Sequence, residues 1–344
     1  MHAHDNCERG REALKMSEFK ILFTSAGRRV SLLRCFKNAL NELGLEGRLI
    51  TADVRKDAAA HLVSDFQELV PPVTSSEYVP LLEEICERHR ISLVVPLIDP
   101  EFPVLASYST DFARLGCKLL VSSRETCELC LDKRKTAAFF LSAGVATPRL
   151  YTLEEALADT SVQYPLMVKP VDGSSSVGTA KASNSGELHF FSQYVSNALI
   201  QEFVEGEEYT LDILLDFEGK ARCVVPRLRI ETRAGEISKG RTVKNRALME
   251  AGKRVAEALP GAIGCITVQV FLTADDQIKF IEINPRFGGG FPLTAASGAN
   301  FPKWIIEMVL NKPSSAAFDA WQDGLVMLRY DEAFFVKNPV KHLR

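Results

Sequence analysis

The chain has 344 residues, of which 46% are hydrophobic and 25% are charged, and its net charge is −3 at pH 7. These values are typical of globular proteins, and the length allows two domains. Lysine and arginine are scattered along the chain, which gives no electrostatic footprint for nucleic acid or for an anionic membrane surface. No apolar run approaches the roughly 18 residues of a membrane-spanning helix.

Both the N-terminus and the cysteines favour an intracellular protein over a secreted one. Residues 1–17 are polar and lack the apolar region of a secretory signal, so we expect a disordered leader there. Most of the eight cysteines lie in apolar patterns that suit free thiols, which predicts the reducing cytoplasm. Cys127 and Cys130 have C-x-x-C spacing, but no second pair completes a zinc site, and a helical coincidence is favoured.

Residues 18–122 alternate short apolar runs with helical patterns, which predicts a parallel, doubly wound α/β domain. Strands are expected at 19–25, 48–54, 92–97 and 118–121, and helices at 30–44, 77–90 and 99–116, the last opened by Asp99 and Pro100. Ligands of such sheets collect at the carboxyl ends of strands, here SAGRR (25–29) and LIDPE (97–101).

The SAGRR turn has one glycine where a dinucleotide fingerprint needs three, which disfavours NAD or FAD. Its backbone amides with Arg28 or Arg29 can hold an anion, and a plain turn with solvated arginines is the alternative.

Residues 123–338 no longer alternate strands with helices, which predicts an antiparallel-rich α+β region. Expected strands are 164–170, 178–182, 198–204, 208–217, 220–231, 265–272 and 278–285. Asp275 and Asp276 signal a hairpin turn between the last two.

The stretch VKPVDGSSSVGTAKA spaces Gly173 and Gly178 as in a P-loop, but Thr179 stands at the lysine position. This loop is expected to join two strands rather than a strand and a helix. Its small residues let backbone amides approach phosphates, and Lys169 supplies a charge from the incoming strand. A flexible surface hairpin is the alternative.

Two later segments add candidate ligands. In QEFVEGEEYTLDILL, the strand edge 201–204 offers backbone groups to a purine, and a following carboxylate can accept ribose hydroxyls; a plain acidic hairpin is the alternative. In IKFIEIN, period-2 alternation puts Phe280, Glu282 and Asn284 on one face. Gln269 in the preceding strand can join Glu282 and Asn284 around Mg²⁺, which prefers oxygen ligands.

The order of these motifs resembles the ATP-grasp superfamily, especially its biotin carboxylase and carbamoyl-phosphate synthetase branch, over roughly residues 18–335. The ending F-I-E-I-N-P-R-F-G-G-G is the most specific element, and the VKP loop and E-F-V-x-G-x-E support it. The resemblance implies a pre-ATP-grasp domain over 18–122 and an ATP-grasp domain over 123–338, with a lid subdomain at about 147–200.

The resemblance also implies roles for individual residues. It implies that ATP is bound by Lys133, Lys169, Gly173, Ser174, Ser175, Ser176, Val177, Gly178, Gln201, Glu202, Phe203, Val204 and Glu208. Mg²⁺ or Mn²⁺ is implied at Gln269, Glu282 and Asn284, and Arg286 is implied to act with Lys169 on the transferring phosphate. Many relatives have an acidic residue at the position of Gln269, whereas the synthetases often have glutamine.

The implied activity is an ATP-dependent ligase that joins a small-molecule carboxylate to an amine through an acyl phosphate. A carboxylate kinase or carbamoyl-phosphate-type enzyme and a non-catalytic ATP-binding module are alternatives, and a homodimer is compatible with the family. Substrate contacts are expected from a mobile basic loop within 227–246, or from the glycines after Arg286, where a solvated loop and a tight turn are the alternatives. The candidates are Arg227, Arg229, Arg233, Lys239, Arg241, Arg286, Gly288, Gly289 and Gly290.

Overall fold

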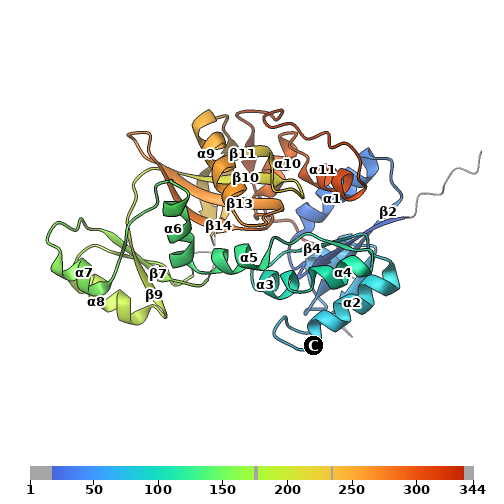
Figure 1. The fold of residues 1–344 in the computed structure, drawn as a ribbon, viewed down its shortest axis with the longest axis horizontal. Helices are drawn as coiled ribbons and strands as arrows, with labels where there is room; N and C mark the ends of the chain where they lie inside the picture. The colour runs from blue at the N-terminus through green and yellow to red at the C-terminus, as the bar shows by residue number, and fades with distance from the viewer. Residues whose placement is uncertain (1–17, 174–176, 234, 337–344) are drawn as a thin grey trace, which may run out of the picture.

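The computed structural model describes residues 18–173, 177–233 and 235–336, so the expected leader at 1–17 lies outside the described residues. Three sheets organise the described part of the chain. Figure 1 shows the N-terminal sheet at one end, a small sheet with its helices at the other, and the largest sheet above and between them. None of the helices in these ranges has the length and apolar character that a membrane crossing requires.

The N-terminal sheet has five strands in the order β3-β2-β1-β4-β5, and every neighbouring pair is parallel. Successive residues of its strands enter opposite hydrophobic cores, as Ile21 and Leu22 do, because helices cover both faces. The predicted doubly wound α/β class is confirmed. Its elements are β1 (Phe19–Thr24), α1 (Val30–Glu42), β2 (Gly47–Asp53), the 3₁₀ helix η1 (Ala59–Val63), β3 (Phe66–Leu69), α2 (Tyr78–His89), β4 (Leu93–Pro96), α3 (Glu101–Ala106), α4 (Ser109–Arg114) and β5 (Lys118–Leu119).

The single helix expected over 99–116 is wrong, because the chain forms two short helices there, α3 and α4. At the break, the hydroxyl of Ser107 donates to the carbonyl of Pro103 at 3.2 Å, and that of Ser109 donates to Ala106 at 3.1 Å. Such side-chain bonds compete with helix continuation. Asp99 also does not begin the helix, whose N-cap is Pro100, and its carboxylate makes a long-range contact instead.

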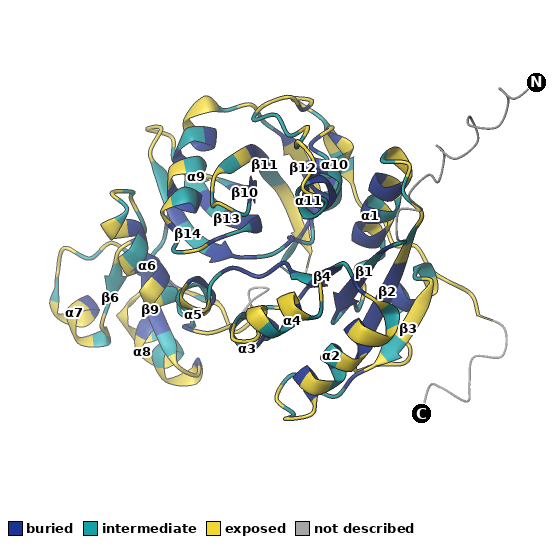
Figure 2. Cartoon of the chain, turned by 45° about the vertical axis from the view of Figure 1, so that its right-hand side comes forward, coloured by how far each residue is buried: buried dark blue, intermediate teal, exposed yellow. Residues whose placement is uncertain are grey.

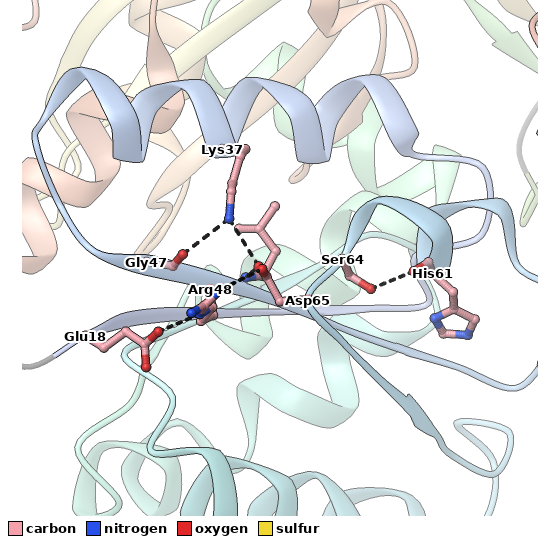
Figure 3. Close-up of polar contacts among 8 residues, drawn as sticks. Glu18, Lys37, Gly47, Arg48, His61, Ser64 and Asp65 are labelled. Carbon is pink, nitrogen blue, oxygen red and sulfur yellow. Dashed lines mark hydrogen bonds and ion pairs between the residues drawn. The ribbon is translucent and has the colours of Figure 1, made fainter.

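The connection between β2 and β3 is held by Asp65, as Figure 3 shows. Its carboxylate accepts from Lys37 and Arg48, each at 3.2 Å, and from the backbone amide of Leu49 at 2.8 Å. Arg48 in turn donates to Glu18 at 2.7 Å. These contacts fix one end of the segment that begins after β2 and lines part of a large cavity.

The small sheet has the order β6-β9-β7-β8 and is antiparallel throughout. The prediction that the glycine-serine loop joins two strands is confirmed, because β7 pairs with β8 in register Val168 to Ala180. The elements of this part are β6 (Leu150–Tyr151), α7 (Leu153–Ala158), β7 (Leu166–Pro170), β8 (Ala180–Ala182), α8 (Ser185–Tyr194) and β9 (Ala198–Glu202). Helices α5 (Arg124–Leu131) and α6 (Lys133–Ser142) precede it.

The largest sheet has six antiparallel strands in the order β14-β13-β10-β11-β12-β15. The hairpin turn expected at Asp275 and Asp276 is present, and Asp276 adopts φ 60° there. The elements are β10 (Glu207–Leu215), β11 (Ala221–Arg233), β12 (Glu236–Thr242), α9 (Arg246–Ala258), β13 (Gly264–Leu272), β14 (Ile278–Asn284), α10 (Phe291–Ala296), α11 (Phe301–Val309) and β15 (Val326–Leu328).

Helix α1 of the N-terminal sheet packs against α10 and α11 of the C-terminal part, so one hydrophobic core crosses between them. The ring of Phe36 contacts that of Phe287 edge-on, with centroids 5.6 Å apart. Figure 2 shows the buried strands of this core beside the exposed outer faces of α2, α7 and α8. Apolar packing therefore joins the N-terminal and C-terminal parts of the chain.

Candidate functional site

A cavity of about 250 Å³ lies between the small sheet and the six-stranded sheet. Most of the expected nucleotide contacts meet in its wall, although they come from separate strands. The lining includes Lys133, Lys169, Gly173, Val177, Gln201, Glu202, Phe203, Val204, Glu208, Gln269 and Glu282. Met167, Phe271 and Ile281 add apolar surface that the motif reading did not single out. Such a mixture of apolar surface and a few polar groups is typical of a ligand site.

Two lysines lie at the loop end of this cavity. Lys133 Nζ donates to the carbonyls of Gly173 at 2.7 Å and Val171 at 3.3 Å, which ties it to the start of the loop. Lys169 lies on β7, and its burial lowers the pKa to about 8, an effect that Glu282 opposes and Lys133 reinforces. A partly desolvated ammonium next to a second lysine is a site that an anion would stabilise.

The glycines of the loop have a backbone reason to be glycine. Gly173 adopts φ 130° and Gly178 adopts φ 72°, conformations that other residues rarely take. Gly173 lines the cavity, whereas at the other end Thr179 does so in place of Gly178. Ser174, Ser175 and Ser176 lie outside the described residues.

The segment 201–204 and Glu208 form a further part of the cavity wall. Arg229 on β11 pairs with Glu208, with Nε 3.0 Å from Oε1, and burial raises the pKa of Glu208 although Arg229 opposes the shift. Glu202 pairs with Lys279 on β14. Arg229, expected to contact the substrate, therefore lies beside the candidate ribose carboxylate instead.

Strand β14 departs from the predicted alternation, because a bulge interrupts its register with β13 between Gln269 and Val270. Phe280 therefore enters the hydrophobic core rather than sharing a face with Glu282, so that part of the prediction is wrong. The expected proximity of the three oxygen ligands holds: Gln269 lies opposite Glu282 in the ladder, and Asn284 Nδ2 donates to Glu282 Oε1 at 2.9 Å.

A chain of polar contacts continues from Glu282 out of the cavity. Arg286 Nη2 donates to Asn284 Oδ1 at 3.2 Å. The same guanidinium makes a bidentate pair with Asp99, through Nε at 2.7 Å and Nη2 at 2.8 Å. Burial lowers the pKa of Arg286, but the carboxylates of Asp99, Glu282 and Glu236 together outweigh this and leave the pKa raised. Asp99, at the carboxyl end of β4, thus connects the N-terminal sheet to β14.

The basic run expected as a mobile loop instead forms two paired strands, β11 over 221–233 and β12 over 236–242, and several of the expected substrate contacts have carboxylate partners within the protein. Arg227 is only 1% exposed and makes a bidentate pair with buried Asp212 at 2.8 and 2.9 Å. Arg233 pairs with Asp331 and Lys239 with Glu231, both at exposed positions. These three cations already have carboxylate partners.

The glycines after Arg286 allow close packing, and two of them also line a second cavity. A Cβ on Gly289 would lie 2.7 Å from the Glu236 carboxylate, and one on Gly290 would lie 2.3 Å from Arg227 Nη1. Gly288 and Gly289 line the second cavity, of about 1150 Å³, whereas Gly290 packs on the core.

That larger cavity contains residues that the motif reading missed. Glu236 on β12 pairs at 2.8 Å with Arg329, which follows the neighbouring strand β15, and the segment 327–334 forms much of the cavity wall. The SAGRR turn contributes Arg28 and Arg29. The sequence pointed to this cavity through the SAGRR turn and through the substrate candidates Arg233, Gly288 and Gly289. Nothing in the sequence around Arg329 did.

Family comparisons divide the chain in the same way as the sheets do. Residues 130–290 match the model described as "ATP-grasp domain", and residues 21–120 match "PylC-like, N-terminal domain". Among curated proteins, the chain is 26% identical over 208 residues to a D-alanine–D-alanine ligase of Pseudomonas fluorescens, covering 53% of this chain and 63% of the ligase. It is 24% identical over 247 residues to a carbamoyl-phosphate synthase of Methanobrevibacter smithii, covering 67% of each.

Solved structures share the fold at low sequence identity. The biotin carboxylase domain of the 2-oxoglutarate carboxylase from Hydrogenobacter thermophilus superposes with a TM-score of 0.72 at 16% identity, covering 90% of this chain and 73% of that one. An L-amino acid ligase from Bacillus licheniformis gives a TM-score of 0.67 at 17% identity, covering 88% and 77%. At these identities the likeness shows the fold alone.

Proposed function

Since this chain belongs to the ATP-grasp superfamily and carries a PylC-like N-terminal domain, we propose that it is an ATP-dependent carboxylate–amine ligase. The proposed reaction activates a small-molecule carboxylate as an acyl phosphate, which an amine then attacks, and it releases ADP and phosphate. The ligases among the similar proteins support this reaction class.

The proposal rests on one observation: a continuous series of side-chain hydrogen bonds leads from the smaller cavity toward the larger one. It runs from Glu282 through Asn284 and Arg286 to Asp99, with contacts of 2.7 to 3.2 Å. Glu282 lines the smaller cavity, and Arg286 and Asp99 lie close enough to Arg29, in the larger cavity, to affect its pKa. A carboxylate held beside Arg286 would therefore lie where it can receive the phosphoryl group directly from a nucleotide in the smaller cavity.

We assign ATP to the smaller cavity. Its phosphates would lie at the loop end, where Lys133 and Lys169 provide positive charge. The edge 201–204 would frame the adenine, and Glu208 would accept the ribose hydroxyls. The partial desolvation of Lys169 supports this orientation, since a phosphate would restore a favourable charge environment.

The side chains at the phosphate end fit a divalent cation such as Mg²⁺ or Mn²⁺, because they offer oxygen donors with a single carboxylate. Glu282 and Gln269 line the cavity and would hold the cation. Asn284 would complete the set through Oδ1, which accepts one hydrogen bond from Arg286 and keeps a second lone pair. When bound, the cation would neutralise phosphate charge.

Arg286 would stabilise the negative charge on the transferring group, and Asp99 would fix the orientation of its guanidinium. The carboxylate oxygen attacks the γ-phosphorus as the bond to ADP breaks. The amine then attacks the acyl carbon, a proton leaves the nitrogen and orthophosphate departs. Catalysis here rests mainly on positioning and charge neutralisation.

A phosphate-release screen tests the proposal. The full chain with Mg·ATP is incubated with pairs of amino acids and small carboxylic acids, and free phosphate is measured. Release that needs both a carboxylate and an amine supports a ligase. Release with a carboxylate alone would make the protein a carboxylate kinase, and no release with any pair would favour a binding module.

A further inference from the structure

The larger cavity has a charge distribution that pairing within the protein does not balance. Its lining includes six cationic side chains and four carboxylates, which are Arg28, Arg29, Arg34, Lys56, Arg233, Arg329, Asp57, Glu236, Asp331 and Glu332. Three ion pairs account for six of these groups: Arg34 with Glu332 at 3.2 Å, Arg233 with Asp331 at 2.9 Å, and Arg329 with Glu236 at 2.8 Å. Asp57 pairs at 2.7 Å with Arg55, a residue that is not part of the lining.

Three cations of this lining remain without an ion pair in the described part of the chain: Arg28, Arg29 and Lys56. All three come from the N-terminal sheet, at the carboxyl ends of β1 and β2. The N-terminal sheet thus contributes positive charge to the lining that no carboxylate of the hairpin or of the C-terminal segment pairs with.

Arg29 is the most informative of the three. Burial lowers its pKa, and the neighbouring charge of Arg286 lowers it further, while Glu236 and Asp99 act in the opposite sense. Both of those carboxylates are already committed, Glu236 to Arg329 and Asp99 to Arg286. A partly buried cation without its own partner is unfavourable, and an anionic ligand group would relieve that cost.

Hydrogen bonds fix the backbone segments that carry these three cations. The Asp53 carboxylate accepts from the amides of Gly27 at 2.8 Å and Arg55 at 2.9 Å, which joins the two segments. The amide of Ala60 donates to the carbonyl of Gly27 at 3.0 Å. Ser25, with φ 47°, donates to buried Glu101 at 2.7 Å. Rigid support of this kind is typical of a preorganised ligand site.

We propose that Arg28, Arg29 and Lys56 form a subsite for a second anionic group of the substrate, a phosphate or a carboxylate, distinct from the carboxylate that is activated. The proposal rests on the proposed function and narrows its substrate class to molecules with two acidic groups. The reacting carboxylate would lie toward Arg286, and the second group would lie against the N-terminal turn.

The size of the cavity is consistent with such a substrate. At about 1150 Å³ it is much larger than the nucleotide cavity of about 250 Å³, and it exceeds what a single small amino acid fills. A substrate that spans from Arg286 to the turn can use its second acidic group to orient the first, which is how remote binding contributes to reaction at a distant atom.

Direct binding of anions tests the subsite without turnover. The full chain carrying Lys169→Ala, which weakens anion binding at the nucleotide cavity, is titrated with inorganic phosphate and, separately, with succinate by calorimetry. We expect saturable binding of at least one probe, weakened about tenfold or more by the double change Arg28→Gln and Arg29→Gln. The matched control is Arg34→Gln, a lining arginine already paired with Glu332, which should bind as its parent does.

Comparing the two probes distinguishes a phosphate from a carboxylate as the second anionic group of the substrate. Tighter binding of phosphate indicates a phosphorylated substrate, and tighter binding of succinate indicates a second carboxylate. Equal affinity in the double variant and its parent would overturn the subsite, as would no saturable binding of either probe. Mg·ATP binding to the unmodified chain is measured separately, so a failure of the nucleotide site is distinguished from a failure of the subsite.

Discussion

The smaller cavity is lined mainly by neighbouring strands of two sheets, whereas the larger one is lined by turns, a hairpin and the C-terminal segment. In the first, β7, β9, β10, β13 and β14 fix most of the lining side chains by their places in a ladder. In the second, segments from residue 28 to residue 336 meet without shared strand pairing around most of the wall. The difference separates a site positioned mainly by strand pairing from a composite site assembled from segments far apart in the sequence.

Replacing Lys169 by alanine should have the largest effect, because it removes a charge from the strand-built cavity. We expect turnover to fall about 10³-fold while the melting temperature changes little, since a single phosphate-stabilising group is worth that much in a dry site. Steady-state phosphate release and thermal unfolding measure the two quantities. The control is Lys303→Ala on α11, far from either lining. Normal phosphate release by folded Lys169→Ala would remove this cavity from the mechanism.

Replacing Asp99 by asparagine tests the connection between the cavities. The guanidinium of Arg286 loses its charged partner but keeps a neighbour of the same shape, so we expect kcat to fall about 10²-fold with little change in the KM for ATP. Asp111→Asn, on α4 of the same part of the chain and outside both linings, is the control. An equal rise in the KM for ATP, or a loss of stability that explains the lost activity, would make the pair structural.

Replacing Glu282 by glutamine removes the one full negative charge among the expected cation ligands. The concentration of Mg²⁺ required for half-maximal activity should rise about tenfold. A Mg²⁺ titration at saturating ATP measures this, with Glu231→Gln on the exposed hairpin as the matched control. Unchanged metal dependence in the Glu282 variant would refute the assignment.

The smallest expected effect is a pH dependence of nucleotide binding. The pKa of Lys169 is lowered to about 8, so above that pH the free protein loses this charge and its affinity for Mg·ATP should fall several-fold per pH unit. The unfolded chain keeps the ordinary, higher pKa; the lowered folded value therefore makes this lysine's contribution to stability rise, not fall, above pH 8. Calorimetric affinities from pH 7 to 9.5 measure the effect, and Lys169→Arg should flatten the profile. A wild-type profile as flat as that of the arginine variant would contradict the shift.

The sequence predicted the strand-built cavity well because its residues lie in motifs with local meaning. Lys169, Glu208 and Glu282 each follow from a strand position and a family pattern, and antiparallel pairing then brings the strands together. The bulge that turns Phe280 into the core was not predictable, because it depends on how β14 packs against α6.

The composite cavity could not be predicted in the same way. The pair of Asp99 and Arg286 joins residues 187 positions apart, and the pair of Glu236 and Arg329 joins residues 93 positions apart. Arg227 shows a related limit of prediction from sequence. It lies in a basic run that suggested substrate contact, but its side chain is buried and pairs with Asp212. Periodicity reports which face of an element is apolar, but not which distant charge a polar residue will meet.

Oxygen-isotope transfer tests the central claim, that a phosphoryl group passes from the nucleotide cavity to a carboxylate in the larger one. The full chain is incubated with Mg·ATP, an amine and a carboxylate labelled with ¹⁸O, using a pair found active in the phosphate screen, and the products are analysed by ³¹P NMR. The account predicts ADP together with orthophosphate that carries one ¹⁸O from the carboxylate. Label in AMP, with pyrophosphate as the other product, would contradict the acyl-phosphate route and the role proposed for Arg286.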